Sequence, residues 1–598
     1  MWSKSLVPLF TSLLAFGLVQ PANAGSNTGC RCVPGDNCWP STVGWKAINL
    51  ILGNTLIKTE PIAQSCYDGP AKDLDHCRYV TDMWPDQDFQ GSDPIGRAYP
   101  YNITCPTVDY DAGEVPEKQC ILGQLPTYAV RATSRLHIYG ALLVARLYNI
   151  RLTVSSTGHD LLGRGDGYGS LSLWLHHYRN DIKFQAQFKS ASRCTKSGWT
   201  GSAIHIDGAY QWRDVYKVAQ DNNVIVVGGG SPTPGAIGGW PSGGGHGPAT
   251  RNYGLGADQI LELEVLLADG RIVTANHCQN TDLFRAIRGG GPGYGIVLSS
   301  TVKAYPNVDK VTAHHVTIVP KIHSAENKDL LDAVSTLMQL YPDLSDAGFA
   351  GYAFWFRNYP GNFIGDSPSG YQHGFWTIGK DQDAAEKGYA PVRQALDKYK
   401  DVLTFNETWA TYSDYWSFYK AESGLYDPVG QTSILTSRLI DRESVKEFEA
   451  VRGAVEVLGG GAEEVVSNVV LLVSGGKVFE DAKDTTSGLH PAWRKSSYAL
   501  ITGSGVPKTA SNELRKAQND NITFIKGAAT KKLAPNTGGY MNEGDRNDPD
   551  YIKTFYGSNY ESHLAAKKKY DPENIFFCAT CVGAEQMVER VDGPLCYA

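Results

Sequence analysis

Three glycine-rich tracts carry the residues of this chain that are best suited to chemistry. The first holds His159, the second holds Ser231 and His246, and the third runs from Arg288 to Gly295. Ten of the twenty residues from Gly228 to Gly247 are glycine. Glycine adopts positive φ freely and lets backbone N–H groups approach a ligand closely, and a concavity of such groups suits a pyrophosphate. The tracts therefore predict a dinucleotide site, while a flexible loop is the alternative interpretation of their composition.

The common nucleotide and nucleophile fingerprints are absent from the chain. It contains no GxGxxG, no GxxxxGK[ST], no GxSxG and no HExxH motif. A Rossmann site, a P-loop, a nucleophile elbow and a zinc-protease helix are therefore all unsupported. Each glycine tract instead borders an apolar element, such as the strand expected at Val224–Val227. This proximity to ordered segments favours a built ligand cradle over a loose linker.

The elements expected around the first two tracts alternate between helix and strand. Helical spacing over Leu136–Tyr148 is followed by a buried strand at Arg151–Val154. Period-two alternation over Ile260–Leu267, the turn Ala268-Asp-Gly-Arg271 and the run Ile272–Thr274 indicate a hairpin. A short amphipathic helix is expected earlier in the chain, at 45–52.

Beyond about residue 308 the pattern changes to aromatic strands separated by helices. This pattern predicts an α+β lobe with an antiparallel sheet covered by helices. The expected strands are Phe349–Phe356, Tyr371–Ile378 and Glu464–Val473, and the expected helices lie near Asp383–Lys400, Ser444–Leu458, Ser511–Thr530 and Asp550–Lys569.

Length and composition limit the classes of protein that this chain can be. Its 598 residues and 65.1 kDa predict two to four lobes. A 42% hydrophobic and 20% charged composition is ordinary for a globular protein and argues against disorder or coiled coil. The net charge of −7 and pI near 6.1 argue against a nucleic-acid partner.

The start of the chain predicts secretion. Met1–Ala24 has a lone Lys4, an apolar run from Leu6 to Val19 and the cleavage-site pattern Ala22-Asn-Ala24, as a signal peptide does. A membrane anchor is the alternative, but the run is shorter than the ~20 residues that a spanning helix needs. No later stretch is apolar enough to span, so no membrane association is expected.

The 12 cysteines fit an oxidising compartment. Ten of them lie in the first 120 residues or the last 21, which predicts disulfides that tie the termini to the body. Cys578-Ala-Thr-Cys581 has the spacing of a zinc or redox motif, but no second CxxC or His pair follows it, so no metal is predicted. Sequons at Asn102, Asn406 and Asn521 are plausible sites of surface glycans.

At this point the motifs resemble a known family, the vanillyl-alcohol-oxidase-type flavoproteins. The closest subgroup is the fungal berberine-bridge-enzyme-like oxidases with a PCMH-type FAD-binding domain. The matching segments, in the order of the family, are Thr157-Gly-His-Asp-Leu-Leu-Gly-Arg164, Gly169–Trp174, Val226–Gly235, Ser242–Gly247, Gly254–Asp258, Arg288–Val297, Tyr540–Glu543 and Phe555–Tyr560. The resemblance covers about residues 30–585.

The resemblance implies one covalent FAD, attached through its 8α-methyl to His159. Many relatives make a second attachment through cysteine, but the matching position here is Ser231. A serine hydroxyl is a far poorer nucleophile than a thiolate near neutral pH, so a single link is expected. The further cofactor contacts implied are Ser156, Thr157, Gly158, Asp160, Leu161, Gly163, Arg164, Gly229, Gly230, Ser231, Gly244, Gly245, Gly254, Leu255, Asp258, Gly295, Ile296, Val297 and Asn542.

The resemblance also implies which residues face the substrate. Tyr540 lies in a Tyr-x-Asn pattern whose tyrosine faces substrate in several relatives, and His246 lies where relatives line the substrate side of the flavin. Aromatic packing is the alternative role for Tyr540. A phenol becomes a base near neutral pH only if cations or hydrogen bonds stabilise its phenolate, and the sequence does not identify such a cation.

The resemblance predicts an extracellular, monomeric FAD-dependent oxidase acting on a small molecule. It would transfer hydride from an alcohol-type substrate to flavin N5, and dioxygen would reoxidise the flavin to give hydrogen peroxide. A dehydrogenase or cyclising enzyme of secondary metabolism is one alternative, and a non-catalytic secreted flavin-binding protein is another. The expected regions are a signal peptide (1–24), a Cys-rich segment (25–123), a two-subdomain FAD-binding domain (124–307), a substrate domain (308–533) and a C-terminal segment returning to the FAD domain (534–598).

Overall fold

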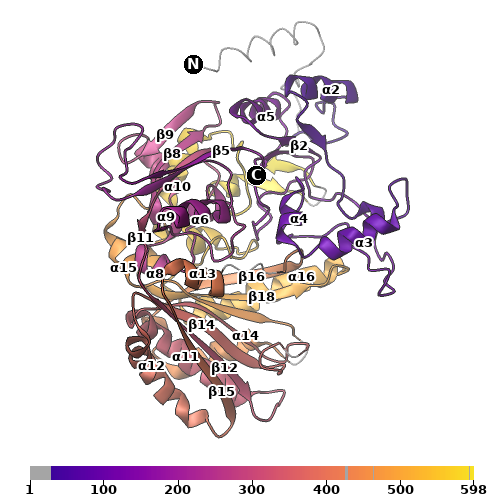
Figure 1. The fold of residues 1–598 in the computed structure, drawn as a ribbon. Helices are drawn as coiled ribbons and strands as arrows, with labels where there is room; N and C mark the ends of the chain where they lie inside the picture. The colour runs from indigo at the N-terminus through magenta and orange to yellow at the C-terminus, as the bar shows by residue number, and fades with distance from the viewer. Residues whose placement is uncertain (1–28, 362, 424–427, 462–463, 591–592) are drawn as a thin grey trace.

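The computed structural model describes residues 29–361, 363–423, 428–461, 464–590 and 593–598. The predicted signal peptide, Met1–Ala24, lies outside these residues. No helix among them is long and apolar enough to cross a membrane. Figure 1 shows an upper half that contains β5, β8 and β9, a lower half built on a large sheet, and N-terminal helices along the right-hand edge.

The first sheet has four strands and carries the first glycine tract at its edge. Its order is β1 (Leu56–Lys58), β2 (Tyr128–Arg131), β4 (Leu171–Trp174) and β3 (Leu152–Ser155), with β2, β3 and β4 parallel. Helices α5 (Arg135–Leu147) and α2 (Thr42–Ile51) share one apolar core with it. Because β1 comes from the Cys-rich segment, that segment is built into the sheet.

The second sheet is antiparallel and contains the predicted hairpin. Its order is β5 (Arg179–Gln185), β6 (Ala203–Gly208), β10 (Ile296–Lys303), β8 (Ile260–Leu266) and β9 (Ile272–Asn276). The β8–β9 pairing confirms the hairpin around residues 268–271. The expected strand at Val224–Val227 is shorter in the structure, where β7 covers Val224–Ile225 and pairs with β11 (Tyr305–Pro306).

Short helices connect these strands. They are α6 (Trp212–Asp221), α7 (Gly239–Ser242), α8 (Thr250–Tyr253), α9 (Gly256–Gln259) and α10 (Thr281–Ile287). Helix α7 lies inside the second glycine tract. Helix α9 begins at Gly256, with Leu255 as its N-cap, and the preceding Gly254 is the C-cap of α8.

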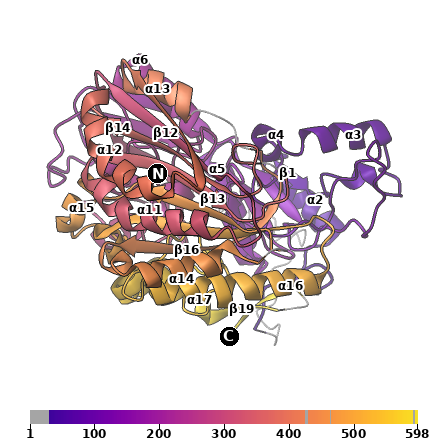
Figure 2. The ribbon, with the colours of Figure 1, turned by 90° about the horizontal axis from the view of Figure 1, so that it is seen from below.

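The third sheet has seven antiparallel strands and confirms the predicted α+β class. Its order is β15 (Leu403–Tyr412), β12 (Val311–Pro320), β14 (Gly370–Ile378), β13 (Phe349–Phe356), β17 (Ser467–Leu472), β18 (Ser496–Val506) and β16 (Thr432–Asp441). Its side chains alternate between two faces. One face packs on α11 (Lys328–Asp346), α12 (Gln382–Leu396), α14 (Phe448–Gly459) and α17 (Gly527–Leu533), which Figure 2 shows on the outside of the sheet.

The opposite face of this sheet turns toward the glycine tracts. Tyr352 of β13, Leu471 of β17 and Ala499 of β18 are neighbours in register on that face. Leu471 and Ala499 share a buried cluster with Leu255 and Tyr540. The remaining helices of this half are α13 (Tyr415–Glu422), α15 (Lys477–Glu480) and α16 (Asn512–Asp520).

The C-terminal segment packs on the second sheet. Its α18 (Tyr560–Tyr570) contacts α10, and Phe555 and Tyr556 share a core with Val265 and Phe284. The predicted helix near Asp550–Lys569 is in fact a π-helical turn at Ile552–Tyr556, a short 3₁₀ turn and α18. Strands β19 (Met587–Glu589) and β20 (Leu595–Tyr597) close the chain.

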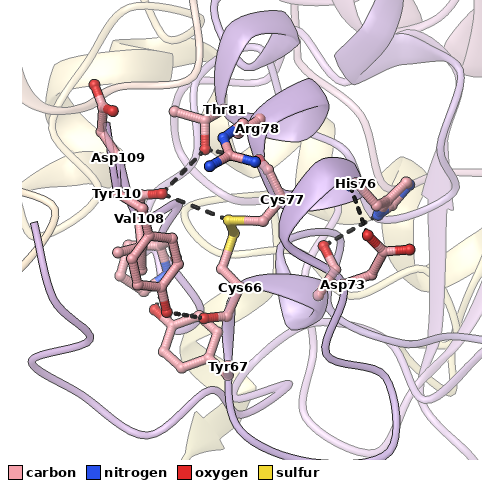
Figure 3. Close-up of a disulfide and its surroundings, with 12 residues drawn as sticks. Cys66, Tyr67, Asp73, His76, Cys77, Arg78, Thr81, Val108, Asp109 and Tyr110 are labelled. Carbon is pink, nitrogen blue, oxygen red and sulfur yellow. Dashed lines mark hydrogen bonds between the residues drawn. A yellow bond between two sulfur atoms is a disulfide. The ribbon is translucent and has the colours of Figure 1, made fainter. Parts of the chain in front are cut away.

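All 12 cysteines lie in the described residues and form disulfides. Cys30–Cys596 joins the two ends of the described chain, which confirms the prediction that disulfides tie down the termini. Cys578 pairs with Cys581, so this motif is a disulfide. Figure 3 shows Cys66 bonded to Cys77 at the start of α3 (Leu74–Met83), where Tyr110 donates to the Cys66 carbonyl at 2.7 Å.

Two arginine–aspartate pairs connect the upper and lower halves. Arg494 donates to both oxygens of Asp258, at 2.7 and 2.9 Å, and Arg288 donates to Asp484 at 2.9 Å. Asp258 and Arg288 are almost completely buried. The nearby Arg288 guanidinium lowers the pKa of Asp484, although burial opposes this effect. Breaking a buried pair leaves an uncompensated charge, which is strongly destabilising.

We therefore expect Arg494→Met to destabilise the protein by about 3 kcal/mol, because Asp258 would remain buried without its cation. The double variant Asp258→Asn/Arg494→Met should recover much of the lost stability. Thermal unfolding of both variants tests this expectation. The control is Lys217→Met, which breaks an exposed pair with Asp221 and should change the melting temperature little. A melting temperature for Arg494→Met equal to that of this control would contradict the assigned role.

Candidate functional site

The first glycine tract leaves β3 as a loop with a distinctive backbone. Gly158 and Gly163 have φ of 74° and 64°, in the left-handed region that favours glycine. A Cβ atom at Gly158 would lie 2.7 Å from the carbonyl oxygen of Gly96, so a side chain does not fit there. Within the described residues, the N–H groups of Gly158 to Leu162 donate to no protein acceptor. Such a row of N–H groups is suited to an anion.

His159 lies between these two glycines and contacts the second tract. Its Nε2 atom is 2.7 Å from the Thr233 hydroxyl, and the Tyr99 ring meets it edge-on at 5.7 Å. Burial lowers the pKa of His159 to about 4. The imidazole is therefore neutral at pH 7 and keeps a lone pair on one nitrogen.

Ser231 lies in the same network as His159. Its hydroxyl is 3.4 Å from the Thr233 hydroxyl and 3.3 Å from Oε1 of Gln87. Thr233 in turn donates to Gln87 Oε1. The structure thus brings the proposed attachment residue and the position of the second link together, although 72 residues separate them in sequence.

Asp160 and Arg164 link the first tract to the C-terminal segment. Asp160 accepts from the Arg164 backbone N–H and from its Nε, both at 2.5 Å. Arg164 Nη2 then donates to Asn542 Oδ1 at 3.2 Å. Of the other predicted contacts here, Thr157 is buried, and Ser156 and Leu161 are half-buried in the loop.

The second tract is packed too closely for side chains at several positions. Gly229 and Gly230 accept from the Tyr216 and Tyr419 hydroxyls, at 2.5 and 2.7 Å. A Cβ at Gly243 would lie 2.1 Å from Asn542 Oδ1. Gly244 and Gly245 have positive φ, and their carbonyls accept from the first residues of α9.

His246 is the centre of a polar cluster at the junction of the two halves. Its Nε2 is 3.0 Å from Oε1 of Glu543, and its Nδ1 is 3.3 Å from the Tyr352 hydroxyl. The Tyr540 ring lies edge-on to it, with centroids 5.3 Å apart. A carboxylate only accepts hydrogen bonds. In a neutral imidazole, Nε2 is therefore the nitrogen that carries the proton, and Nδ1 has the lone pair that accepts from Tyr352.

Tyr540 is buried against His246 and Trp493. Its hydroxyl oxygen accepts from Asn542 Nδ2 at 3.0 Å and from the Gly245 backbone. Burial raises its pKa above the ordinary value for a phenol, Glu543 adds to that rise, and Arg164 and the two hydrogen bonds oppose it. Arg164 is a nearby cation that the sequence did not identify, but it lowers the pKa of Tyr540 less than burial raises it. Tyr540 therefore stays protonated near neutral pH.

A cavity of about 150 Å³ opens on the sheet face next to this cluster. Tyr352, Phe354 and Trp376 form its aromatic walls. His315 and Glu422 form an ion pair at its edge, with Nε2 and Oε2 2.9 Å apart. The hydrogen bond that His315 donates to Glu422 raises the pKa of His315, which favours the protonated imidazole at the edge of this aromatic cavity.

Several predicted cofactor residues have their side chains elsewhere. Asp258 is engaged by Arg494 and by the Leu255 backbone N–H. Leu255 and Ile296 lie in buried clusters, and Val297 packs at the edge of others. Gly295 lies against β8, where a Cβ would be 2.8 Å from the Leu266 carbonyl oxygen, and Gly254 ends α8 with φ of 98°. Contacts of these residues with a cofactor stay predictions.

Four residues of the site were not among the predicted ones. Glu543 lies three residues after Tyr540 in a recognised motif, so this spacing could have pointed to it. Tyr352 lies in a recognised aromatic strand, where the alternation of side chains could have pointed to it. Thr233 lies two residues beyond Ser231. Gln87 comes from α4 (Gln87–Gly91) in the Cys-rich segment, and no sequence pattern singles it out.

The geometry fits a flavin dinucleotide in three respects. It provides a row of free N–H groups, a backbone cradle that a Cβ would fill, and a neutral histidine beside it. Comparison with known proteins gives the same answer. Residues 126–276 match a family described as "FAD binding domain", and residues 539–582 match "Berberine and berberine like".

The chain is 61% identical over 567 residues to FAD-linked oxidoreductase hmp9 of Hypomyces subiculosus, covering 95% of this chain and 90% of that protein. It belongs to the FAD-linked oxidoreductases. Among solved structures, this oxidoreductase is similar to the VAO-type flavoprotein MtVAO713 from Myceliophthora thermophila C1. That likeness has 66% identity, a TM-score of 0.94 and coverage of 96% of this chain and 100% of the other.

The fold also extends to distant flavoproteins. One is the glucooligosaccharide oxidase from Acremonium strictum, whose cofactor is described as a 6-S-cysteinyl, 8α-N1-histidyl FAD. This structure has 16% sequence identity to the chain and a TM-score of 0.60. That likeness covers 77% of this chain and 92% of the other. The FAD-linked oxidoreductase is thus an enzyme with a two-subdomain FAD-binding unit of PCMH type and a substrate domain on an antiparallel sheet.

We expect Gly243→Ala to lower the activity of this oxidoreductase without changing the backbone φ at position 243. The new methyl group would displace Asn542 from the Trp240 carbonyl and the Tyr540 hydroxyl. Losing those hydrogen bonds should cost about 1–3 kcal/mol and lower kcat/KM by about tenfold or more. The control is Gly239→Ala, because a Cβ there meets nothing within 4 Å. Equal flavin content and kcat/KM in the two variants would show that the cradle is not as tight as described.

Proposed function

We propose that this protein is a secreted FAD-dependent oxidase that removes a hydride from an alcohol-type substrate and gives hydrogen peroxide. The observation that carries the proposal is the position of His246. It lies between Glu543 and two phenols, beside a cavity and close to the glycine cradle. Such a constellation can take a proton from a substrate hydroxyl while the cofactor takes the hydride.

FAD would be held by the first two glycine tracts and linked to His159. When bound, it supplies the two-electron acceptor and returns the electrons to dioxygen. The neutral imidazole of His159 supports attachment, because only an unprotonated ring nitrogen has a lone pair to form the bond. The Arg164 guanidinium and the N–H groups of Gly158–Leu162 would face the phosphates of FAD.

We propose a single covalent link. The flavin positions named in the distant glucooligosaccharide oxidase, 6 and 8α, belong to the same benzenoid ring with only position 7 between them, so a histidine and a cysteine that occupy both must lie on the same side of the flavin. Here the Thr233 hydroxyl contacts both the Ser231 hydroxyl and Nε2 of His159, so Ser231 and His159 are linked through Thr233. Ser231 therefore has the location of a second link without the thiol that would form one.

The proton acceptor in this proposal is the His246–Glu543 pair. Glu543 holds the Nε2–H of His246 and stabilises the imidazolium that forms when Nδ1 takes a proton. Nδ1 already accepts from Tyr352, whose ring lines the cavity. A substrate hydroxyl in the cavity could pass its proton to Nδ1 directly or through the Tyr352 hydroxyl.

Tyr540 would act as a hydrogen-bond donor and not as the base. Its oxygen already accepts two hydrogen bonds, so its own proton is free to point toward a ligand. Burial keeps that proton in place near neutral pH. Tyr540 would therefore orient the substrate oxygen for the transfer to His246.

The cavity favours a planar or ring-shaped substrate with an oxygen acceptor. Phe354, Trp376 and Tyr352 offer faces for stacking on an aromatic ring or a sugar. The raised pKa of His315 favours its protonated form, which would donate from the edge of the cavity to a carbonyl, phenolate or carboxylate oxygen. This combination suits aromatic alcohols and oxygenated ring systems of secondary metabolism.

The extracellular location is part of the proposal. Six disulfides without a free cysteine are typical of an oxidising compartment. Of the three sequons, Asn406 is exposed on the edge strand β15 and can carry a glycan readily. The Asn521 side chain instead donates to Glu464 at 2.6 Å, which opposes glycosylation there. We propose a monomer without nucleic-acid or membrane partners.

Stopped-flow spectroscopy tests the oxidase and its proton acceptor together. Anaerobically reduced enzyme should regain its oxidised flavin spectrum rapidly in air-saturated buffer, and slow return would favour a dehydrogenase. With a substrate found by a peroxide-release screen of aromatic alcohols, sugars and polyphenols, Glu543→Gln should slow flavin reduction by about 100-fold, the usual contribution of general base catalysis. Reoxidation should stay unchanged.

Two variants make this test specific. Glu407→Gln alters another histidine–glutamate pair, His314–Glu407, on the helix-covered side of the sheet, and should leave the reduction rate unchanged. Tyr540→Phe should lower the rate but keep the shape of the pH profile up to about pH 9, because a raised pKa keeps its phenol protonated there. Loss of a titration step in Tyr540→Phe would instead identify Tyr540 as the base.

A further inference from the structure

A strap from the Cys-rich segment crosses the junction beside the flavin cradle. We define the strap as residues 84–98, which include α4. Trp84 donates to the Gly430 carbonyl of the lower half at 2.7 Å, and Asp88 pairs with Arg213 of the upper half at 2.7 Å. The Ala98 N–H donates to Gly158 at 3.0 Å. The strap is therefore fixed to both halves within one residue of His159.

Gln87 of this strap completes a directed chain of hydrogen bonds. The Thr233 hydroxyl donates to Gln87 Oε1, which can only accept. Having given its one proton to Gln87, the Thr233 oxygen must act as the acceptor toward His159. The 2.7 Å contact between Thr233 and His159 Nε2 is then an Nε2–H donor bond.

We propose that Thr233 and Gln87 are positioning residues for covalent flavin attachment, which hold His159 in the tautomer with its lone pair on Nδ1. The inference rests on the proposed His159 linkage, and it gives a physical reason for bonding at Nδ1, the N1 atom of the 8α-N1-histidyl FAD named for the distant glucooligosaccharide oxidase. A neutral imidazole has one N–H and one lone pair, so fixing the proton on Nε2 leaves Nδ1 as the nucleophile. The neutral state of His159 in the structure agrees with this role.

Burial makes the relay hard to replace by water. Gln87 is 2% exposed and Thr233 is 0% exposed. If either polar group is removed, the imidazole loses the contact that sets its tautomer and its orientation. Both tautomers would then be populated, and attachment would slow because only one of them presents its lone pair at Nδ1.

The attachment is balanced with dioxygen as the oxidant. One C–H bond of the flavin 8α-methyl and the imidazole N–H break, and one C–N bond forms between that carbon and Nδ1. Two electrons pass through the cofactor to dioxygen. One proton is released from the methyl group and one from His159 Nε2. Dioxygen takes up these two protons together with the two electrons and becomes hydrogen peroxide. After attachment, Nε2 is an acceptor, and the Thr233 hydroxyl can turn to donate to it.

The test is the fraction of flavin that stays with the full-length protein after acid denaturation. Thr233→Val and Gln87→Leu should bind FAD but retain less than half of the wild-type covalent fraction in freshly purified protein. Thr233→Ser keeps the hydroxyl and should retain the wild-type fraction. Ser92→Ala is the control, since Ser92 is exposed in the same strap and its hydroxyl donates to the Phe89 carbonyl, away from His159. The isolated flavin peptide of wild type should be substituted at Nδ1 by NMR.

The outcomes separate this inference from the proposed linkage. A wild type without covalent flavin would refute the linkage itself. Covalent wild type together with full covalent fractions in both Thr233→Val and Gln87→Leu would overturn the relay, and so would substitution at Nε2. Melting temperature and non-covalent FAD content distinguish failure to fold from failure to attach. A variant that melts like wild type and binds FAD only non-covalently supports the relay.

Discussion

The site depends on one packing constraint, the close approach of the second glycine tract to the C-terminal segment. At Gly243 the space for a methyl group is taken by the Asn542 amide, whose Oδ1 would lie 2.1 Å from it. The same amide contacts Arg164 of the first tract and Tyr540. A backbone without side chains thus lets segments that are some 380 residues apart in sequence share one polar network. This network includes Tyr540 and lies next to Glu543, which contacts His246.

The two halves of the molecule are held in register by buried charge and by the strap. Arg494–Asp258 and Arg288–Asp484 cross from loops of the lower half to the base of the cradle. Residues 84–98 cross on the opposite side and donate or accept hydrogen bonds in both halves. These contacts matter for chemistry because Tyr352 and His246 come from different halves and meet at 3.3 Å. The N-terminal Cys-rich segment is consequently a structural part of the site.

The sequence predicted the elements that carry a regular pattern, and it missed those whose pattern is interrupted. The β8–β9 hairpin, α5 and the strand β13 have clear periodicity and lie where expected. The 19-residue helix α11 was missed, because its many buried apolar residues contact strands that are distant in sequence; its internal Pro342 is not the reason, since α12 was predicted with Pro391 inside it. Gln87 could not be found from sequence, since its role exists only once α4 reaches Thr233. Asp258 was expected at the cofactor, but its carboxylate is occupied by Arg494, a partner 236 residues away.

We propose that the glycine cradle holds one FAD bonded to His159 alone. Mass spectrometry of the denatured and deglycosylated protein tests it most directly. We expect the mass of the polypeptide plus one FAD less two hydrogen atoms, with the added mass on the proteolytic peptide that contains His159 and none on the peptide that contains Ser231. The polypeptide mass alone, or a flavin on any other peptide, would contradict it.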